Sequence, residues 1–348
     1  MIVPPSSSTQ ADPAPPLPRG DISSAVLGVL LGEKGELPAP AEAVRADPYG
    51  DDLQLALYSL YELHYWGFQG VDPRREWDPR LLSLRSALED HFLDALRHEV
   101  ARAGRSVGRA LDELLAEPAR DDGSSVTHFL QHHGELWQLR EYAAIRSLYH
   151  LKEADPHVWV VPRLRGRAKA GMVAVEFDEF GAGRAEDIHA TLFANLMADL
   201  GLDGTYGRYL DAAPAEALAT VNLMSLFGLH RLWRGALVGH FASVEVTSSP
   251  ASRRLARAMH RTGAGPAAER FYDEHVEADA VHEQVVRREV IGGLLAGEPG
   301  LEPDVVFGID TTAELDRRLA ATLLEAWRHG RTALKTPLTA PSRSRAPE

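Results

Sequence analysis

The sequence predicts an all-α fold, and three observations support that class. Apolar residues recur at three- and four-residue spacing through most of the 348-residue chain, as on the buried face of an amphipathic helix. Alternating patterns typical of strands are rare and short. Hydrophobic residues make up 45% of the chain, which is enough to bury a sizeable core. We therefore expect long helices packed around a common interior.

The expected helices follow one another along the chain with short connections. Each has an apolar face, and most place charged residues opposite it. They cover residues 53–68, 81–103, 135–154, 163–180, 184–199, 213–247 (as one or two helices), 267–296 and 311–330. The Gly-Ala-Gly of residues 181–183 interrupts this pattern, because glycine lowers helix stability by about 1 kcal/mol relative to alanine. Residues 116–125 and 261–269 resemble helix–helix loops.

A single domain is expected over residues 21–334, between two tails. Residues 1–20 are rich in Pro, Ser and Ala, and residues 335–348 are similar but basic. Neither tail can bury enough apolar surface to offset its ordering entropy, so both are expected to be disordered. No Pro/Gly-rich linker between them is long enough to separate two domains.

Composition excludes several classes of function. The chain has no cysteine, which rules out disulfides, zinc–thiolate sites, iron–sulfur clusters and a cysteine nucleophile. The formal net charge of −13 disfavours general binding to nucleic acid or to anionic membranes. No stretch of about 18 apolar residues predicts a membrane span, and no signal peptide is visible. A reducing cytoplasm fits these features and is the expected location.

Two segments carry the candidate chemistry. Glu186 and His189 are three residues apart and are expected on one face of a helix. His275, Asp279 and His282 would form one stripe along another helix. Carboxylates and imidazoles from separate helices are the ligands of dinuclear sites in helical bundles. Carboxylates offset the charge of two ferrous ions, and neutral imidazoles bind iron.

Single carboxylates could complete such a site. Glu153 lies near the end of the helix 135–154, and Glu179 directly precedes the Gly-Ala-Gly break. Unwinding at glycine would let the Glu179 carboxylate move onto or off a metal. Each motif also has a structural alternative, a solvated helix face or an ion-pair stripe. His240 and Glu245, within an apolar helix, could line a substrate pocket, but a core histidine and an interface carboxylate are favoured.

Four strings resemble the haem-oxygenase-like diiron oxidases and oxygenases, whose bacterial members are often called iron-containing redox enzymes. They are LKEADPHVW (151–159), PRLRGRAKAGMVAVEFDEFGAGRAEDIHATLF (162–193), TVNLMSLFGLHRLWRGALVGHFASVE (220–245) and FYDEHVEADAVHE (271–283). The resemblance covers roughly residues 135–295 and extends more weakly toward residue 50. It implies a haem-oxygenase-like helical bundle.

The resemblance also implies a ligand set for two Fe²⁺ ions per chain. One ion would be held by Glu153, Glu186 and His189. The other would be held by His275, Asp279 and His282. Glu179, which matches an additional carboxylate of the nitrogen-oxygenating branch, would be shared or switchable.

The implied activity is activation of O₂ to oxidise a small organic substrate. Glu179 favours N-oxygenation of an amino-acid-derived amine, as in specialised metabolism, while oxidative C–C cleavage and oxidative decarboxylation stay open. The alternatives from other classes are a haem-binding haem oxygenase and a metal-free helical binding protein. An external electron donor could take part, and the apolar stretch 220–246 could supply a homodimer face. No residue is matched to substrate binding.

Overall fold

The computed structural model describes residues 12–100, 104–116 and 123–338, without the side chains of residues 277–280. Within these ranges the chain is helical and has no strand, which confirms the all-α class. The α-helices are α1 (Asp21–Leu30), α2 (Pro40–Ala43), α3 (Asp51–Glu62), α4 (Pro79–Glu99), α5 (Val107–Leu115), α6 (Val126–His132), α7 (Leu136–His150), α8 (Asp155–Val158), α9 (Gly166–Glu179), α10 (His189–Asp199), α11 (Ala215–Leu229), α12 (Arg234–Thr262), α13 (Pro266–Val285), α14 (Gly292–Gly297) and α15 (Glu302–Arg328).

Short 3₁₀ helices and one π-helical turn connect these elements. The 3₁₀ helices are η1 (Pro73–Trp77), η2 (Val161–Arg163), η3 (Gly181–Gly183), η4 (Ala185–Asp187), η5 (Leu210–Ala212), η6 (Arg231–Trp233) and η8 (Pro299–Leu301). The π turn η7 (Val286–Ile291) divides the expected helix 267–296 into α13 and α14. The expected segment 213–247 is also divided, because the chain turns at η6 between α11 and α12. No described helix combines the length and the apolar character needed to cross a bilayer.

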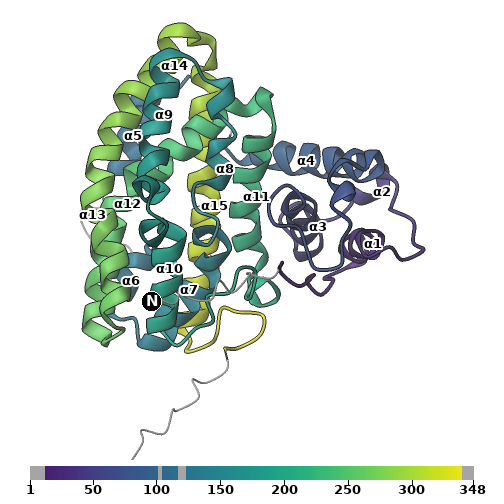
Figure 1. Ribbon diagram of the computed structural model, residues 1–348, viewed down its shortest axis with the longest axis horizontal. Helices are drawn as coiled ribbons and strands as arrows, with labels where there is room; N and C mark the ends of the chain where they lie inside the picture. The colour runs from purple at the N-terminus through teal and green to yellow at the C-terminus, as the bar shows by residue number, and fades with distance from the viewer. Residues whose placement is uncertain (1–11, 101–103, 117–122, 339–348) are drawn as a thin grey trace, which may run out of the picture.

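The long helix α12 organises the bundle. It packs against α13 on one side and α15 on the other (Figure 1). The α12–α15 crossing is close because glycines lie at the contact. A Cβ on Gly239 would collide with the carbonyl oxygen of Val305, and one on Gly308 would collide with that of Ala236. Only glycine permits this approach of the two backbones.

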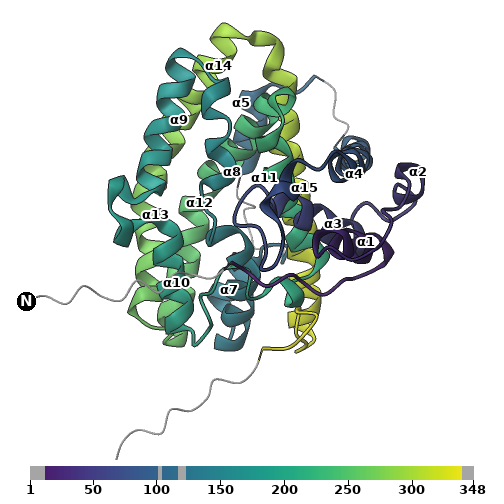
Figure 2. The ribbon, with the colours of Figure 1, turned by 45° about the vertical axis from the view of Figure 1, so that its right-hand side comes forward.

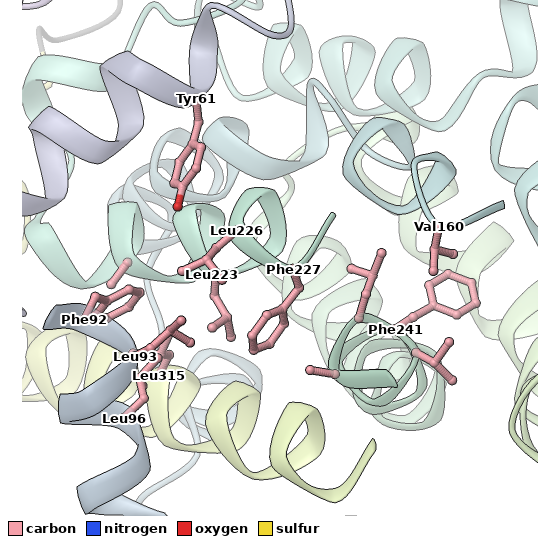
Figure 3. Packing of buried hydrophobic residues seen from close by; sticks show 14 of the residues in the cluster. Tyr61, Phe92, Leu93, Leu96, Val160, Leu223, Leu226, Phe227, Phe241 and Leu315 are labelled. Atoms are coloured by element: carbon pink, nitrogen blue, oxygen red, sulfur yellow. The ribbon is translucent and has the colours of Figure 1, made fainter. Parts of the chain in front are cut away.

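The first four helices lie beside this bundle, on the side away from α9, α10 and α13 (Figures 1 and 2). They are joined to it by a continuous apolar cluster. In Figure 3, Tyr61 of α3 and Phe92 of α4 point toward Leu223 of α11, and Leu96 lies near Leu315 of α15. Burial of these side chains holds the N-terminal helices on the α11–α15 face.

Residues 12–20 differ from the expected disordered tail. The carbonyl of Pro13 accepts a hydrogen bond of 2.9 Å from the Gln69 amide, and the Leu17 amide donates to Asp211 over 2.8 Å. Arg19 pairs with Asp51 at 2.9 Å. The prolines of this segment reduce the entropy lost on ordering, which composition alone did not reveal. At the start of the expected C-terminal tail, the Lys335 amide likewise donates to the Ala212 carbonyl over 2.8 Å. Residues 1–11 and 339–348, the outer parts of the two expected tails, lie outside the described residues.

Candidate metal centre

Five segments of the described chain bring carboxylates and imidazoles together inside the bundle. They are the turn after α7, the end of α9, the start of α10, the middle of α12 and the second half of α13. Each side chain is between 2% and 8% exposed. The six side chains are Glu153, Glu179, His189, Glu245, His275 and His282.

The first group of candidate ligands contains Glu153, Glu179, His189 and His275. Each offers one ligand atom, and these atoms lie within 4.8 Å of one another. The Nδ1 of His189 is 2.6 Å from Oε2 of Glu179, and the His189 and His275 rings are 4.4 Å apart. Two imidazoles and two carboxylates therefore converge at one place.

The second group contains Glu179, Glu245 and His282, whose ligand atoms also lie within 4.8 Å of one another. The Nδ1 of His282 is 3.2 Å from Oε2 of Glu245 and 3.6 Å from Oε1 of Glu179. Glu179 thus directs Oε2 toward His189 in the first group and Oε1 toward His282 in the second. One carboxylate connects both groups.

The tautomer of His275 is suited to metal binding. Its Nδ1–H donates to the carbonyl of Phe271 over 2.7 Å. Its Nε2 is buried and has no hydrogen-bond partner among the described residues. A neutral imidazole held by an Nδ1–H donor keeps the Nε2 lone pair free for a metal. This orphaned nitrogen within a carboxylate-rich cluster fits a bound cation, and the oxygen and imidazole donors suit iron.

Glu153 is ionised in these surroundings. Burial disfavours its charge, but the imidazole of His150, whose Nδ1 is 3.0 Å from Oε2, and the rings of His275 and His189 together lower the pKa of Glu153 below its ordinary range. Burial also lowers the pKa of His150. Glu153 therefore offers a charged carboxylate at the candidate site, which is the state that a cation requires.

The carboxyl group of Glu176, one turn before Glu179 on α9, behaves differently. It is 4% exposed, and neither oxygen has a hydrogen-bond partner in the described structure. Burial, followed by the nearby charges of Glu179 and Glu245, raises the pKa of Glu176 well above its usual value. Burial thus favours the uncharged form of Glu176, which lies outside both candidate ligand groups.

The Gly-Ala-Gly turn places Glu179 and His189 opposite each other. Helix α9 ends at Glu179, and residues 181–183 all have left-handed φ angles of 68°, 51° and 83°. A Cβ on Gly181 would lie 2.7 Å from the backbone of residues 187–188. The chain therefore reverses tightly, and the break predicted from the two glycines is confirmed.

The turn that carries Glu153 is tied to the N-terminal helices. Lys152 is 2% exposed, and its Nζ lies 2.8 Å from Oε2 of Glu62 on α3. The same ammonium group is 4.1 Å from the centre of the Tyr65 ring. Ala154 follows with a φ of 77°, unusual for a residue with a side chain. A buried ion pair thus braces the strained turn beside the candidate ligand.

The structure brings together five of the seven predicted ligands: Glu153, Glu179, His189, His275 and His282. The expectation that Glu186 and His189 share a helical face is wrong. Glu186 is exposed in η4, and α10 begins only at His189, because Ile188 is extended with a ψ of 130°. Asp279 lies within α13, but its side chain is outside the described part of the structure.

Two features of the cluster were not expected from the sequence. Glu245 joins the second group, although an interface role was favoured for it, and His275 groups with His189 and not with His282. The sequence feature that could have identified Glu245 as a ligand is its position as a single carboxylate in the otherwise apolar middle of α12. His240, on the same helix, is buried with its Nδ1 2.8 Å from Thr312, as favoured for a core histidine.

The segment that contains this cluster is similar to known proteins. A family model described as iron-containing redox enzyme matches residues 140–317, just over half of the chain and the part that contains every clustered side chain. A nitrosourea synthase of Streptomyces achromogenes subsp. streptozoticus is 25% identical over 236 residues. The alignment covers 65% of this chain and 49% of that relative, so the chain spans about half the length of the curated protein it matches.

Proposed function

Because the chain belongs to the iron-containing redox enzyme family, we propose that it is a non-haem diiron oxygenase or oxidase that uses O₂ to oxidise a small organic substrate. The observation that carries this proposal is the position of Glu179, with one oxygen toward each group of candidate ligands. A carboxylate shared between two sets of donors is what a dinuclear centre needs.

The ligands divide naturally between two ions. Glu153, His189 and His275 would hold one, while Glu245 and His282 would hold the other. Glu179 would bridge them. Asp279, four residues after His275 and three before His282 on α13, stays a predicted further ligand. Two ferrous ions, when bound, would supply electrons and coordination positions for the reduction of O₂.

The protein's own side chains prepare this chemistry. Burial of the cluster keeps bulk water from competing for the coordination positions. The Phe271 carbonyl fixes the ring of His275 with Nε2 toward the other donors. The bond between His150 and Glu153 orients that carboxylate in the same way.

We propose oxidation at nitrogen as the reaction, on an amino-acid-derived amine. The relative is named for the synthesis of a nitrosourea, and Glu179 lies ten residues before His189, as in the nitrogen-oxygenating branch that the sequence resembles. Placing one oxygen atom of O₂ on an amine nitrogen releases the other as water. That step consumes two electrons and two protons, so an external electron donor belongs to the proposal.

The test is anaerobic loading of the full chain with ferrous iron, metal analysis, and then a pulse of O₂ with panels of amines and fatty acids. We expect about two irons per chain, a transient visible absorption band and a hydroxylated amine. Products of C–C cleavage or of decarboxylation would show that the reaction is one of these and not oxidation at nitrogen. A chain that retains no iron and gives no transient would rule the proposal out.

The same samples address the two alternative functions. A haem-binding protein would show a Soret band on addition of haem, but three buried carboxylates beside the imidazoles make a poor surface for a porphyrin. A metal-free binding protein would show the same iron content with and without the His282 imidazole.

A further inference from the structure

A cavity of about 550 Å³ lies where the N-terminal helices meet the turns that carry two candidate ligands. Its walls come from the residues that follow α3, from α8 with the adjoining Trp159, and from Phe180, which directly follows α9. None of the six clustered side chains lines this cavity. Its volume lies within the roughly 300–1,000 Å³ of small-molecule sites, so it is a candidate binding site separate from the proposed metal centre.

Aromatic side chains form most of the wall. Tyr65 and Trp159 pack with their ring centres 4.8 Å apart. Phe180 lines the same cavity, as does Trp66, which is 47% exposed. The faces of these rings carry negative charge density that attracts cations, and indole attracts them most strongly. Two indoles, a phenol and a phenyl ring around one cavity therefore favour a positively charged ligand that also has apolar surface.

One carboxylate lies among these rings. The half-buried side chain of Asp155 makes no hydrogen bond, and no ion pair within 4.0 Å, with a described residue. The ammonium group of Lys152 influences Asp155 but is already paired with Glu62 at 2.8 Å. His64, also in the wall, bonds to Glu76 over 2.8 Å, and burial lowers the pKa of His64. The charge of Asp155 therefore has no counterion of its own among the described residues, and a bound cation would stabilise it.

The inner side of this region shows that the fold can hold an ammonium group in the same way. The Nζ of Lys152 lies 4.1 Å from the centre of the Tyr65 ring and 4.8 Å from that of Tyr58, while it pairs with Glu62. Aromatic rings and a carboxylate together surround this cation. The outer cavity has the same two components, and no lysine or arginine lines it. Its cation must therefore come from a separate molecule.

We propose that this cavity binds a small organic cation, a quaternary or alkylated ammonium group, with its charge beside Asp155. Its methyl groups contact Trp66, Trp159 and Phe180. A neutral ligand would leave the carboxylate without a counterion, and a bare metal ion would leave the apolar faces of the rings uncovered. The site lies outside both candidate ligand groups, so binding requires neither iron nor O₂.

The position of the cavity gives the bound cation a structural effect. Asp155 is two residues after Glu153. Phe180 directly follows Glu179, and Trp66 belongs to the segment after α3. A ligand in contact with these walls connects the N-terminal helices to both turns. Because such a ligand binds only the folded chain, the melting temperature should rise with its concentration.

Titration of the iron-free full chain with choline tests the proposal, followed by tryptophan fluorescence and by calorimetry. The matched probe is 3,3-dimethyl-1-butanol, which has the shape of choline but carbon in place of the charged nitrogen. The salt concentration is kept constant with NaCl. The pH is 8, at which the Asp155 carboxyl, whose pKa burial raises to about 6, is ionised. We expect saturable binding of choline at millimolar concentration or below, and about ten-fold weaker binding of the neutral alcohol.

Variants separate the site from general structure. Asp155→Asn should remove the preference for choline over the neutral alcohol. Trp66→Leu should weaken choline binding by about three- to thirty-fold, and Trp66→Phe should restore part of it. Trp77→Leu is the matched control, because Trp77 is 66% exposed and does not line the cavity. Thermal unfolding of each variant checks that the fold is retained.

Three results would overturn the inference. Choline shows no saturable binding at millimolar concentration, the neutral alcohol binds as tightly as choline, or Trp66→Leu binds choline like Trp77→Leu. The diiron proposal fails separately, on iron retention, because these titrations contain no iron. A chain that binds choline but retains no iron would reject the metal centre alone.

Discussion

Oε2 of Glu179 lies 2.6 Å from Nδ1 of His189, across a turn whose three residues all have left-handed backbone angles. The two side chains belong to different helices, α9 and α10, whose directions are set by that turn. Because Glu179 also approaches His282, the turn controls how both candidate ligand groups meet. Substitution of its glycines is therefore expected to change the positions of Glu179 and His189 relative to each other.

Replacement of Gly181 by alanine should destabilise the protein by about 2–4 kcal/mol, since the new Cβ meets the backbone of residues 187–188 and the φ angle is left-handed. Gly183→Ala is the control. It also has a left-handed φ but nothing near its Cβ, so only about 1 kcal/mol is expected. Urea unfolding compares them, and equal losses would show that contact with residues 187–188 does not matter.

Glu179→Gln should reduce the iron content of the anaerobically loaded chain from about two ions to one or fewer, because both groups lose the charge of their shared carboxylate. Glu176→Gln, one turn earlier, should retain both ions, since Glu176 lies outside both candidate ligand groups and its burial favours the uncharged carboxyl. Metal analysis distinguishes the two. Loss of iron from both variants alike would argue against the specific role of Glu179.

His282→Ala and Glu245→Gln should each remove iron from the second group while leaving the first group in place. We expect about half the iron of the unaltered chain, and a weaker absorption transient on exposure to O₂. His260→Ala, on the exposed part of α12, serves as the control. Unchanged iron content in the Glu245→Gln variant would show that Glu245 is not a metal ligand and would favour the interface role.

Gly239→Ala and Gly308→Ala should each lower stability by about 1–3 kcal/mol or more, because the added methyl groups force α12 and α15 apart. Gly297→Ala, at the exposed end of α14 with no atom near its Cβ, should have little effect. Thermal unfolding gives the comparison. Similar melting temperatures for all three variants would mean that α12 and α15 can move apart without loss of stability.

Stability should fall as the pH decreases from about 7 to about 4, in part because burial lowers the pKa of His157 to about 4. The pKa of a histidine in the unfolded chain is about 6.5. Between about pH 6.5 and about pH 4 the unfolded chain therefore binds more protons than the folded chain, and lowering the pH favours unfolding. His157→Phe, at a site already 5.0 Å from the Phe241 ring, should reduce the loss between pH 7 and 5 by about 2 kcal/mol.

The control for this pH dependence is His260→Phe, since His260 is exposed. Its free energy of unfolding should follow the unaltered chain at both pH values. If the stability of the His157→Phe protein keeps the original pH dependence, the loss of stability at low pH must come from other buried histidines. His240 is one of them, because burial also lowers its pKa.

Helical periodicity predicted the helices that carry the candidate site. Local spacing pointed to His189, His275 and His282, whereas Glu153 and Glu179 were proposed as single carboxylates from their positions near a helix end and a glycine break. The spacing of His275 and His282 fixed their common face on α13, because a helix determines which residues lie one above another. Glu186 was misplaced for the same reason. Its spacing to His189 has meaning only inside a helix, and the left-handed turn delays the start of α10 until His189.

Glu245 could not be assigned from sequence, because its partners come from other helices. Glu179 is on α9 and His282 is on α13, and neither has a fixed distance from α12 until the bundle is packed. The cavity lined by Trp66 and Trp159 has the same origin, since the segments after α3 and α8 meet only in the folded molecule. Local rules describe single helices, and packing decides which of them become neighbours.

The bond between Lys152 and Glu62 bears on how the chain can be divided. Glu62 lies well before residue 140, where the family match begins, whereas Lys152 adjoins a candidate ligand within it. A fragment trimmed to residues 140–317 would remove the counterion of Lys152 and also the Tyr58 and Tyr65 rings that cover its ammonium group. We therefore expect the leading helices to be needed for stable folding of the segment that matches the family, and a shortened expression fragment should include them.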